Sequence, residues 1–307
     1  MKTCEGVIPI VATPFNDDES LDLKSLANLI RFYAKLGVEG VTILGVLGEA
    51  SRLTDAEREM VIDAAVQTAQ GRLPVIVGVS HPGTEATIEH CRVAERLGAA
   101  AAMVAPSPQP VPRDQVVFDY YQRVAAKTNL PLVVQDHPAS TQVHMSVELL
   151  LRLAKEIPAI ICIKAEAVPS PSKIAALKQG LAAGRPVTIL TGLGALYGLF
   201  DLECGSDGFN TGFAFPEVLQ AILGAHKEGK GDVARELFTR HLPLIVFEQQ
   251  PGVAIRKEIL RLRGLIASNR VRHPGAPIDP ATAGQLKRLL DATFPSTDLT
   301  KPLNLGL

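Results

Sequence analysis

One lysine of this chain stands where its amine could act as a nucleophile. Lys164 ends the apolar run Ile160-Ile161-Cys162-Ile163 and lies two residues before Glu166. Such a run is typical of a strand that is buried on both faces. Burial disfavours the charged form of an amine, and a neutral lysine can attack a carbonyl to form a Schiff base. The alternative is a strand-end lysine that extends its charge to solvent.

Glu166 shares a strand face with Lys164, because side chains two residues apart point to the same side of a strand. If Lys164 faces inward, the carboxylate of Glu166 is therefore beside it. We predict that this carboxylate moves protons during the reaction. The alternative is a solvated residue that enters the loop Ala167–Pro171.

The scaffold for these residues follows from the hydrophobic pattern, in which short β-branched runs alternate with helix-period stretches. The predicted strands are Val7–Val11, Gly40–Leu44, Val75–Val79, Ala100–Ala105, Leu132–Gln135, Ile160–Lys164, Val187–Leu190 and Gly208–Thr211. The predicted helices are Leu23–Leu36, Asp55–Gln70, Thr84–Leu97, Asp114–Lys127, Val147–Glu156, Ser172–Ala182, Ala195–Glu203 and Pro216–Lys227. Eight such units in series predict an α/β fold, a closed (β/α)8 TIM barrel; a doubly wound sheet is the alternative.

Helices alone follow the eighth unit, at Asp232–Phe247, Val253–Arg263 and Ala281–Thr293. No linker rich in proline, serine or charge precedes them. We therefore expect residues 1–228 to form the barrel. Residues 229–307 are expected to form a C-terminal helical extension that packs on it.

Composition and charge argue against several classes of function. The net charge of −1 gives no basic footprint for a nucleic acid, and no apolar run approaches the ~18 residues that span a bilayer. The four cysteines have no CxxC spacing, so a reduced, cytoplasmic protein is expected. The seven histidines are scattered, and we predict neither a metal nor a cofactor.

Several segments, taken in order, resemble the dihydrodipicolinate synthase/N-acetylneuraminate lyase family of class I aldolases. The resemblance runs through Ala12-Thr13-Pro14-Phe15, Gly45-Val46-Leu47-Gly48-Glu49, Leu53-Thr54-x-x-Glu57, Leu132–Pro138 and Ile161-Cys162-Ile163-Lys164, and it includes the C-terminal helices. It implies a barrel that assembles as a homotetramer or dimer. It also implies that the strand-six lysine, matched by Lys164, forms an imine with pyruvate or another 2-oxo acid.

The chain departs from the family pattern at the residues that move protons. Val46 and Leu47 stand where the family usually has two hydroxyl residues, and Gln135 stands at its strand-five tyrosine. The synthase branch's second tyrosine falls in Ser107-Pro108, and its carboxylate-binding arginine falls at Ser140. We therefore expect neither dihydrodipicolinate synthesis nor sialic acid cleavage.

Residues at the ends of strands five and six could replace this hydroxyl relay. If Gln135 occupies the tyrosine position, His137 also points inward. We predict that Lys164 is the nucleophile, that Glu166 or His137 shuttles protons, and that Gln135 donates a hydrogen bond to an oxygen. The alternative for His137 is a structural role in a turn.

The predicted substrate contacts lie at the C-terminal ends of the strands, where barrels of this type hold their chemistry. Oriented backbone amides of the loop Gly45–Glu49 (the glycine loop) can hold a carboxylate without hydroxyl side chains. Gly192 belongs to a loop where barrels often bind phosphate, although a bare turn fits its glycines as well. The predicted contacts are Thr13, Val46, Leu47, Gly48, Ser140, Gly192 and Asn210.

The sequence supports two functional hypotheses. The first is a cofactor-independent lyase that forms a Lys164 imine with a 2-oxo acid and then cleaves a carbon–carbon bond or removes water through the same enamine. The second is a barrel that binds a 2-oxo acid without turning it over, as a sensor or a remnant. Turnover on a panel of 2-oxo acids separates the two.

Overall fold

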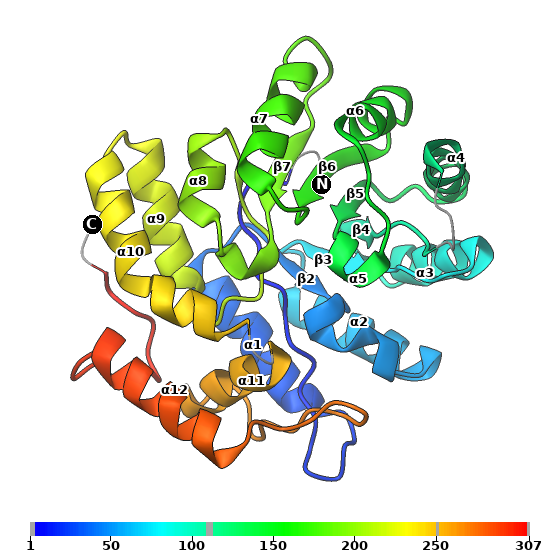
Figure 1. The fold of residues 1–307 in the computed structure, drawn as a ribbon. Helices are drawn as coiled ribbons and strands as arrows, with labels where there is room; N and C mark the ends of the chain where they lie inside the picture. The colour runs from blue at the N-terminus through cyan, green and yellow to red at the C-terminus, as the bar shows by residue number, and fades with distance from the viewer. Residues whose placement is uncertain (1–3, 109–112, 250–251, 306–307) are drawn as a thin grey trace.

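The predicted α/β barrel is confirmed by the computed structural model, which describes residues 4–108, 113–249 and 252–305 (Figure 1). Its eight strands are hydrogen-bonded in the order β1-β8-β7-β6-β5-β4-β3-β2, and every pair is parallel. A parallel bridge between Ile10 and Thr42 joins the two edges of this order. The sheet is thereby closed into a ring, with helices around it.

The strands and helices follow one another along the chain in the predicted order. The strands are β1 (Gly6–Val7), β2 (Val41–Ile43), β3 (Val75–Gly78), β4 (Ala101–Val104), β5 (Leu132–Asp136), β6 (Ile160–Ala165), β7 (Thr188–Thr191) and β8 (Gly208–Phe209). The helices around the barrel are α1 (Leu23–Leu36), α2 (Asp55–Ala69), α3 (Thr84–Arg96), α4 (Asp114–Ala125), α5 (Pro138–Thr141), α6 (Val147–Glu156), α7 (Ser170–Leu181), α8 (Gly198–Glu203) and α9 (Pro216–Lys227). The C-terminal helices are α10 (Gly231–Phe247), α11 (Val253–Leu262) and α12 (Pro280–Thr293).

Element boundaries differ from the prediction where the backbone leaves regular geometry. β1 is shorter than Val7–Val11, because Pro9 has no N–H to donate to the ladder. The predicted helix Ala195–Glu203 begins only at Gly198, because Ala195 takes a left-handed conformation with φ of 66°. α5 and two short 3-10 turns, at Val46–Gly48 and Ala50–Arg52, were not predicted.

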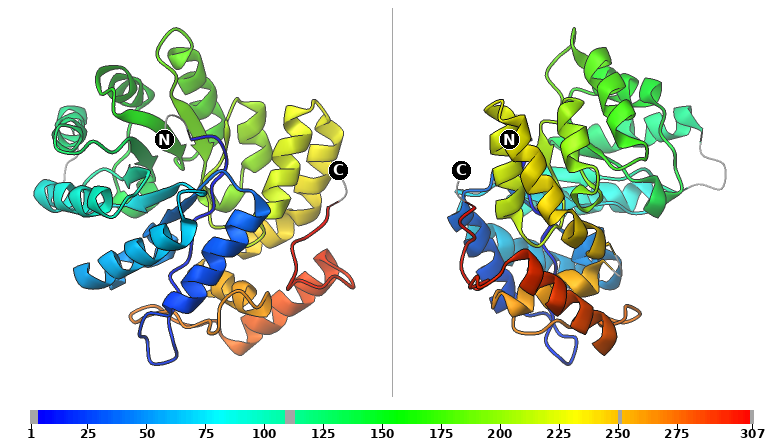
Figure 2. Two further views of the ribbon diagram at one scale, coloured as in Figure 1. Left: turned by 180° about the vertical axis from the view of Figure 1, so that it is seen from behind. Right: turned by 60° about the vertical axis from the view of Figure 1, so that its left-hand side comes forward.

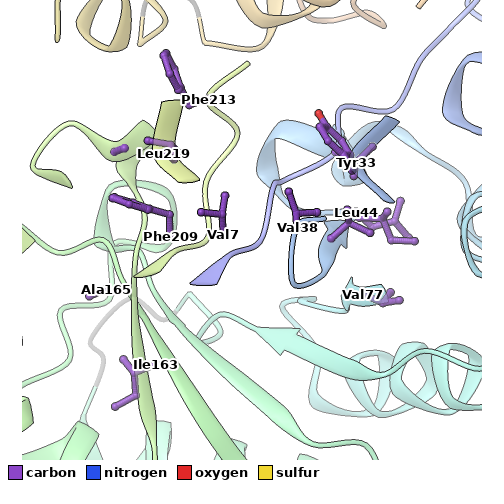
Figure 3. Packing of buried hydrophobic residues seen from close by; sticks show 14 of the residues in the cluster. Val7, Tyr33, Val38, Leu44, Val77, Ile163, Ala165, Phe209, Phe213 and Leu219 are labelled. Atoms are coloured by element: carbon purple, nitrogen blue, oxygen red, sulfur yellow. The ribbon is translucent and has the colours of Figure 1, made fainter. Parts of the chain in front are cut away.

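The strands separate two apolar clusters. The inner cluster fills the barrel with Ile8, Met103, Val133, Cys162 and Leu190, among others. The outer cluster contains the alternate strand residues and the helix faces that cover them; Ile163, Ala165, Phe209, Tyr33 and Leu219 are shown in Figure 3. Because Cys162 faces inward, Lys164 at two residues further along β6 faces inward as well.

The C-terminal helices pack on the barrel and on one another (Figures 1 and 2). α10 contacts α8 and α9, and α12 contacts α10 and α11. The side chain of Arg263 at the end of α11 is buried, donates to the carbonyl of Ala214 at 2.7 Å and pairs with Glu217 of α9. In the described residues, no helix is both long enough and apolar enough to span a membrane.

Candidate active site

Lys164 lies at the C-terminal end of β6, inside the barrel. In the register of the sheet it is opposite Gln135 of β5 and Leu190 of β7. Its side chain is only 5% exposed. The strand thus delivers an amine into a site from which most bulk water is excluded, as the apolar run before it predicts.

The carboxylate of Glu166 lies beside that amine and is held from three directions. Its Oε2 is 3.1 Å from Nζ of Lys164 and accepts a hydrogen bond from Nε2 of Gln135 at 2.8 Å. Its Oε1 accepts the amide N–H of Leu193 at 3.1 Å. Burial by itself raises the pKa of Glu166, but Lys164, His137 and these two hydrogen bonds together bring the pKa below its usual range. Glu166 is therefore the ionised partner in the resting site.

Gly192 is required by the position of Glu166. A Cβ at Gly192 would overlap the Glu166 carboxylate. The next amide along the loop, that of Leu193, already donates to Glu166. The loop after β7 therefore positions a carboxylate of the protein, and one of the amides that a phosphate would need is already used.

A cavity of about 200 Å³ lies beside this pair. Its lining brings together Gln135 of β5 and Lys164 of β6, His137 and Glu166 directly after these strands, and Val46 and Leu47 of the glycine loop. A second cavity of about 620 Å³ shares Gly45, Val46 and Gln135 with the first and extends along the ends of β3 and β4. None of the four tyrosines, all of which lie in the described part of the chain, lines either cavity.

His137 and Ser140 form a hydrogen-bonded pair near the boundary of the two cavities. His137 lines the smaller cavity and Ser140 lines the larger one. Nδ1 of His137 is 2.7 Å from Oγ of Ser140, and the backbone of His137 begins α5. The serine hydroxyl therefore orients the imidazole, which leaves Nε2 for contact with a ligand.

Thr13, Gly48 and Asn210 line neither cavity among the described residues, and the side chains of Thr13 and Asn210 donate hydrogen bonds within the protein. Thr13 Oγ1 donates to the carbonyl of Gly48 at 2.6 Å. Asn210 Nδ2 donates to the carbonyl of Ile8 at 2.8 Å and to Thr42 Oγ1 at 2.9 Å. Thr13 thus supports the glycine loop, and Asn210 joins β8 to the neighbouring strands.

The glycine loop has a turn of 3-10 geometry at its centre. The amides of Gly48 and Glu49 donate to the carbonyls of Gly45 and Val46 at 3.0 and 3.1 Å. The amides of Val46 and Leu47 donate to none of the described residues. The side chain of Val46 is 58% exposed, which leaves the loop's outer surface open.

The C-terminal helices contribute residues that strand-end reasoning does not reach. Gln249, Gly252 and Arg256 line the smaller cavity. A signal for Arg256 was present in the sequence, because three consecutive charged residues on α11, Arg256-Lys257-Glu258, cannot all lie on one solvent-facing side of an amphipathic helix. All three are in fact buried. In the part of the chain that the structure describes, no group of histidine, cysteine or acidic side chains could hold a metal ion.

The sequence matches one family model. Residues 3–293 match the description "Dihydrodipicolinate synthetase family". L-2-keto-3-deoxyarabonate dehydratase of Azospirillum brasilense is 35% identical over 288 residues, which cover 92% of each chain.

Solved structures of the same family superpose on the fold. Dihydrodipicolinate synthase from Rhodopseudomonas palustris gives a TM-score of 0.90 at 36% identity, over 94% of this chain and 97% of that one. A prophage protein of the family from E. coli K12, solved in complex with pyruvate, gives 0.87 at 29% identity, over 94% and 98% of the two chains. The resemblance found in the sequence motifs is confirmed.

Proposed function

Because this chain belongs to the dihydrodipicolinate synthetase family and is a lyase-type enzyme, we propose that its reaction runs through an imine between Lys164 and a 2-oxo acid. The observation that carries the proposal is the pair formed by Lys164 and Glu166, 3.1 Å apart and almost fully buried beside a small cavity. A nucleophile and a base within hydrogen-bond reach are the arrangement that covalent catalysis by an amine requires.

The imine forms in steps that this pair can carry out. Lys164 passes its proton to Glu166, and the neutral Nζ attacks C2 of the substrate. The new C–N bond forms as the C2–O π bond opens, and a proton moves from nitrogen to oxygen to give a carbinolamine. Glu166 returns its proton to that hydroxyl, which leaves as water, so the imine is protonated and Glu166 is again a carboxylate. Glu166 then removes a proton from C3, and the electrons of that C–H bond form the enamine.

Dehydration is the branch that we favour from this enamine. The enamine expels the C4 hydroxyl, which takes up a proton and leaves as water, and a C3–C4 double bond forms. Hydrolysis of the imine then frees Lys164 and the unsaturated 2-oxo acid. The resemblance to L-2-keto-3-deoxyarabonate dehydratase supports this branch. So does Glu166, because a carboxylate beside the amine can serve C3 where no tyrosine lines the cavity.

Aldol cleavage remains the second candidate, because it shares the enamine. In that branch the protonated imine is cleaved directly: a base takes the proton of the C4 hydroxyl, the C3–C4 bond breaks, its electrons form the enamine, and an aldehyde leaves. His137 is the residue placed to act there, since it lines the cavity and is oriented by Ser140 at 2.7 Å. Gln135 holds Glu166 in place at 2.8 Å and lines both cavities, so its amide can also contact a substrate oxygen.

The substrate's C1 carboxylate is proposed to bind at the glycine loop. The amides of Val46 and Leu47 have no acceptor among the described residues, and both residues line the smaller cavity. Oriented backbone amides attract an anion without needing a hydroxyl side chain. Gly48, whose own amide donates to Gly45, and Thr13 then act by shaping this loop.

We further propose that the enzyme works in a reduced, cytoplasmic environment and assembles as a homotetramer or dimer. None of the four cysteines, all of which lie in the described part of the chain, forms a disulfide, which fits a reducing compartment. The exposed apolar side chains of Val46 and Val168 near the strand ends fit a contact with a second subunit. Sedimentation of the purified protein tests the assembly directly.

Trapping with borohydride tests the imine. Incubation with pyruvate and borohydride should add one reduced adduct, and peptide mass analysis should place it on the peptide that contains Lys164. Turnover of 2-keto-3-deoxy sugar acids should then release water without pyruvate if the enzyme is a dehydratase. Trapping without turnover on any such acid would favour the binding protein over the enzyme.

Dihydrodipicolinate synthesis is not part of the proposal. Val46, Leu47 and Gln135 supply none of the hydroxyls on which that branch relies, and no tyrosine lines the cavities. We expect negligible condensation of pyruvate with aspartate semialdehyde, measured by the absorbance of the cyclic product. Robust condensation would mean that water or another group replaces the hydroxyl relay.

A further inference from the structure

A buried arginine reaches the smaller cavity from outside the barrel. Arg256 belongs to α11, and its side chain is only 6% exposed. Among the described residues it is the only arginine that lines this cavity, which it shares with Lys164 and Glu166. Guanidinium groups are almost never fully buried unless something pairs with them, so Arg256 needs partners at this site.

Glu248 holds one side of the guanidinium. Nε of Arg256 donates to Oε2 of Glu248 at 3.0 Å, and the Glu248 side chain is fully buried. The same carboxylate also accepts the amide N–H of Ala214, at 3.2 and 3.3 Å to its two oxygens. Because the guanidinium is planar, a fixed Nε also fixes the direction of the two terminal nitrogens.

The two terminal nitrogens occupy space that glycines leave open. At Gly194 the place of a Cβ is filled first by the side-chain amide of Gln249, with Nη2 of Arg256 at 2.9 Å, and Nη1 lies 3.3 Å from the place of a Cβ at Gly252. Neither nitrogen donates a hydrogen bond to any residue that the structure describes. Neither nitrogen is among the fully buried atoms that lack a partner, so both are open to the cavity, where an acceptor on a bound molecule can pair with them.

The charge around Arg256 favours an acceptor that is negative. Burial raises the pKa of Glu248 to about 7, against the opposing effect of Arg256, so its carboxylate is only partly ionised at neutral pH. The nearby Arg263 is already paired with Glu217. Glu248 holds only Nε of Arg256, so the two terminal nitrogens present the positive side of the guanidinium to the cavity. A carboxylate can meet its two nitrogens at once, whereas a hydroxyl brings no charge.

We infer that Arg256 binds a second carboxylate at the far end of the substrate, so that the enzyme acts on 2-oxo diacids. The inference rests on the proposed function, because the imine at Lys164 is the other anchor of the ligand. Glu166 lies against Gly192 and Arg256 against Gly194, so the two anchors are displaced from each other along the loop after β7. In a diacid of five or six carbons, three or four bonds of about 1.5 Å separate the reacting carbon C2 from the carbon of the far carboxylate, a span of roughly 4–5 Å.

The test compares 2-oxo acids of equal length that end differently. 2-Oxoglutarate ends in a carboxylate and 2-oxovalerate in a methyl group; 2-oxoadipate and 2-oxohexanoate repeat the comparison with one more carbon. The readout is the concentration that gives half-maximal borohydride trapping on Lys164, measured by mass spectrometry. We expect the diacid to be favoured roughly 10–100-fold at one length or both, as for a charge-assisted hydrogen-bonded pair.

Three variants assign that preference to Arg256. Arg256→Gln should lose it while pyruvate trapping changes less than about threefold, because pyruvate has no far end. Arg261→Gln is the matched control, since Arg261 is on the same helix and its side chain is 41% exposed. If the single variant does not fold with Glu248 left unpaired, the double variant Arg256→Gln/Glu248→Gln removes both charges and should show the same loss.

Each outcome bears on one of the two proposals. Equal trapping of diacids and monoacids by the wild-type enzyme at both lengths, all on Lys164, overturns this inference and leaves the proposed function intact. So does an Arg256→Gln variant in which pyruvate trapping falls as far as 2-oxoglutarate trapping, because Arg256 would then serve the C1 carboxylate or the fold. If no 2-oxo acid is trapped on Lys164 of the wild-type enzyme, the proposed function fails first.

Discussion

Among the residues that the structure describes, two lysine–glutamate pairs are buried, and only one of them faces a cavity. Lys164 and Glu166 are 5% and 7% exposed and lie beside the smaller cavity. Lys257 and Glu49 are 0% and 1% exposed and line neither cavity among the described residues. The chemistry of the two pairs is the same, so the comparison isolates the effect of their surroundings.

The second pair is closed by other protein groups. Nζ of Lys257 also donates to the carbonyl of Arg270 at 2.7 Å and lies 4.3 Å from the centre of the Phe15 ring. Glu49 also pairs with Arg52 and accepts a hydrogen bond from the backbone amide of Arg272 at 3.1 Å. Lys257 therefore joins α11 to the glycine loop, and no carbonyl substrate can approach its amine.

A lowered lysine pKa, taken alone, would identify the wrong pair as the reactive one. Burial lowers the pKa of Lys257 to about 8, although Glu49 opposes that shift. A lysine of lowered pKa is commonly taken as a candidate nucleophile. Here the lowered pKa reports only a structural ion pair, and the open space beside Lys164 is the feature that identifies the reactive amine. Access of a substrate through a cavity, and not burial, therefore decides which of the two buried amines can react.

The largest expected effect separates the two lysines. Lys164→Met should abolish borohydride trapping and lower turnover by at least about 10⁴-fold, because it removes the nucleophile. Lys257→Met should keep trapping but lose about 3–5 kcal/mol of stability, since Glu49 remains buried without its lysine. Mass spectrometry and thermal unfolding measure the two results. An adduct on the peptide that contains Lys257 would reverse the comparison.

The next effect separates the two glutamates. We expect Glu166→Gln to preserve the fold and, after long incubation, imine trapping, while turnover falls by roughly 10²–10⁴-fold, because an amide cannot exchange a proton. Glu49→Gln should do the opposite, with lower thermal stability and turnover within about tenfold of the wild type. If Glu166→Gln turned over at the wild-type rate, the shuttle would be His137, a substrate group or water. If it also lost trapping, Glu166 would support the nucleophile itself.

The barrel and the pair that faces the cavity, Lys164–Glu166 (the open pair), could be predicted from sequence because both follow from short-range rules. Strand–helix alternation gave the eight units, and the two-residue period of a strand put Lys164 and Glu166 on one face. Their contact is indeed found, at 3.1 Å. Gln135 was expected to donate to an oxygen, and in this structure that oxygen belongs to Glu166.

The pair that is shut off from the cavities, Lys257–Glu49 (the closed pair), and Arg256 could not be predicted in the same way. The burial of Lys257 depends on how α11 packs against a loop that is some 200 residues earlier in the chain, where Glu49 lies, and the burial of Arg256 depends on how α11 folds back on Glu248. Position at a strand end also gives no information on hydrogen-bond partners. Thr13 and Asn210 occupy the expected strand ends, yet their side chains bond to Gly48 and to Ile8 and Thr42.

A smaller effect should appear in the pH dependence of the closed pair. The pKa of Lys257 is about 8 in the folded protein and about 10.4 for an ordinary lysine in an unfolded chain. Between these values the unfolded state binds more protons, so stability rises with pH in this window. We expect the unfolding free energy of the wild type, relative to Lys257→Met/Glu49→Gln, to rise by about 1–3 kcal/mol from pH 8 to 10.

Urea titrations at several pH values provide that measurement. The double variant is the reference because it carries neither titrating group of the pair. A difference that stays constant from pH 8 to 10 would show that Lys257 titrates alike in both states. The strong pairing with Glu49 would then cancel the effect of burial, and the closed pair would be no more perturbed than a surface lysine.

The smallest effect concerns Thr13, which links the glycine loop of the cavity to the closed pair behind it. Its hydroxyl donates to the carbonyl of Gly48, directly before Glu49. Thr13→Val keeps the shape but leaves that carbonyl without a donor, so we expect a stability loss of about 1 kcal/mol and a less than tenfold rise in the pyruvate concentration needed for trapping. Thr13→Ser retains the hydroxyl and should behave as the wild type. If Thr13→Val instead lowered turnover as far as Glu166→Gln does, the hydroxyl would act on the substrate. The loop would then belong to the open pair's chemistry and not only to its support.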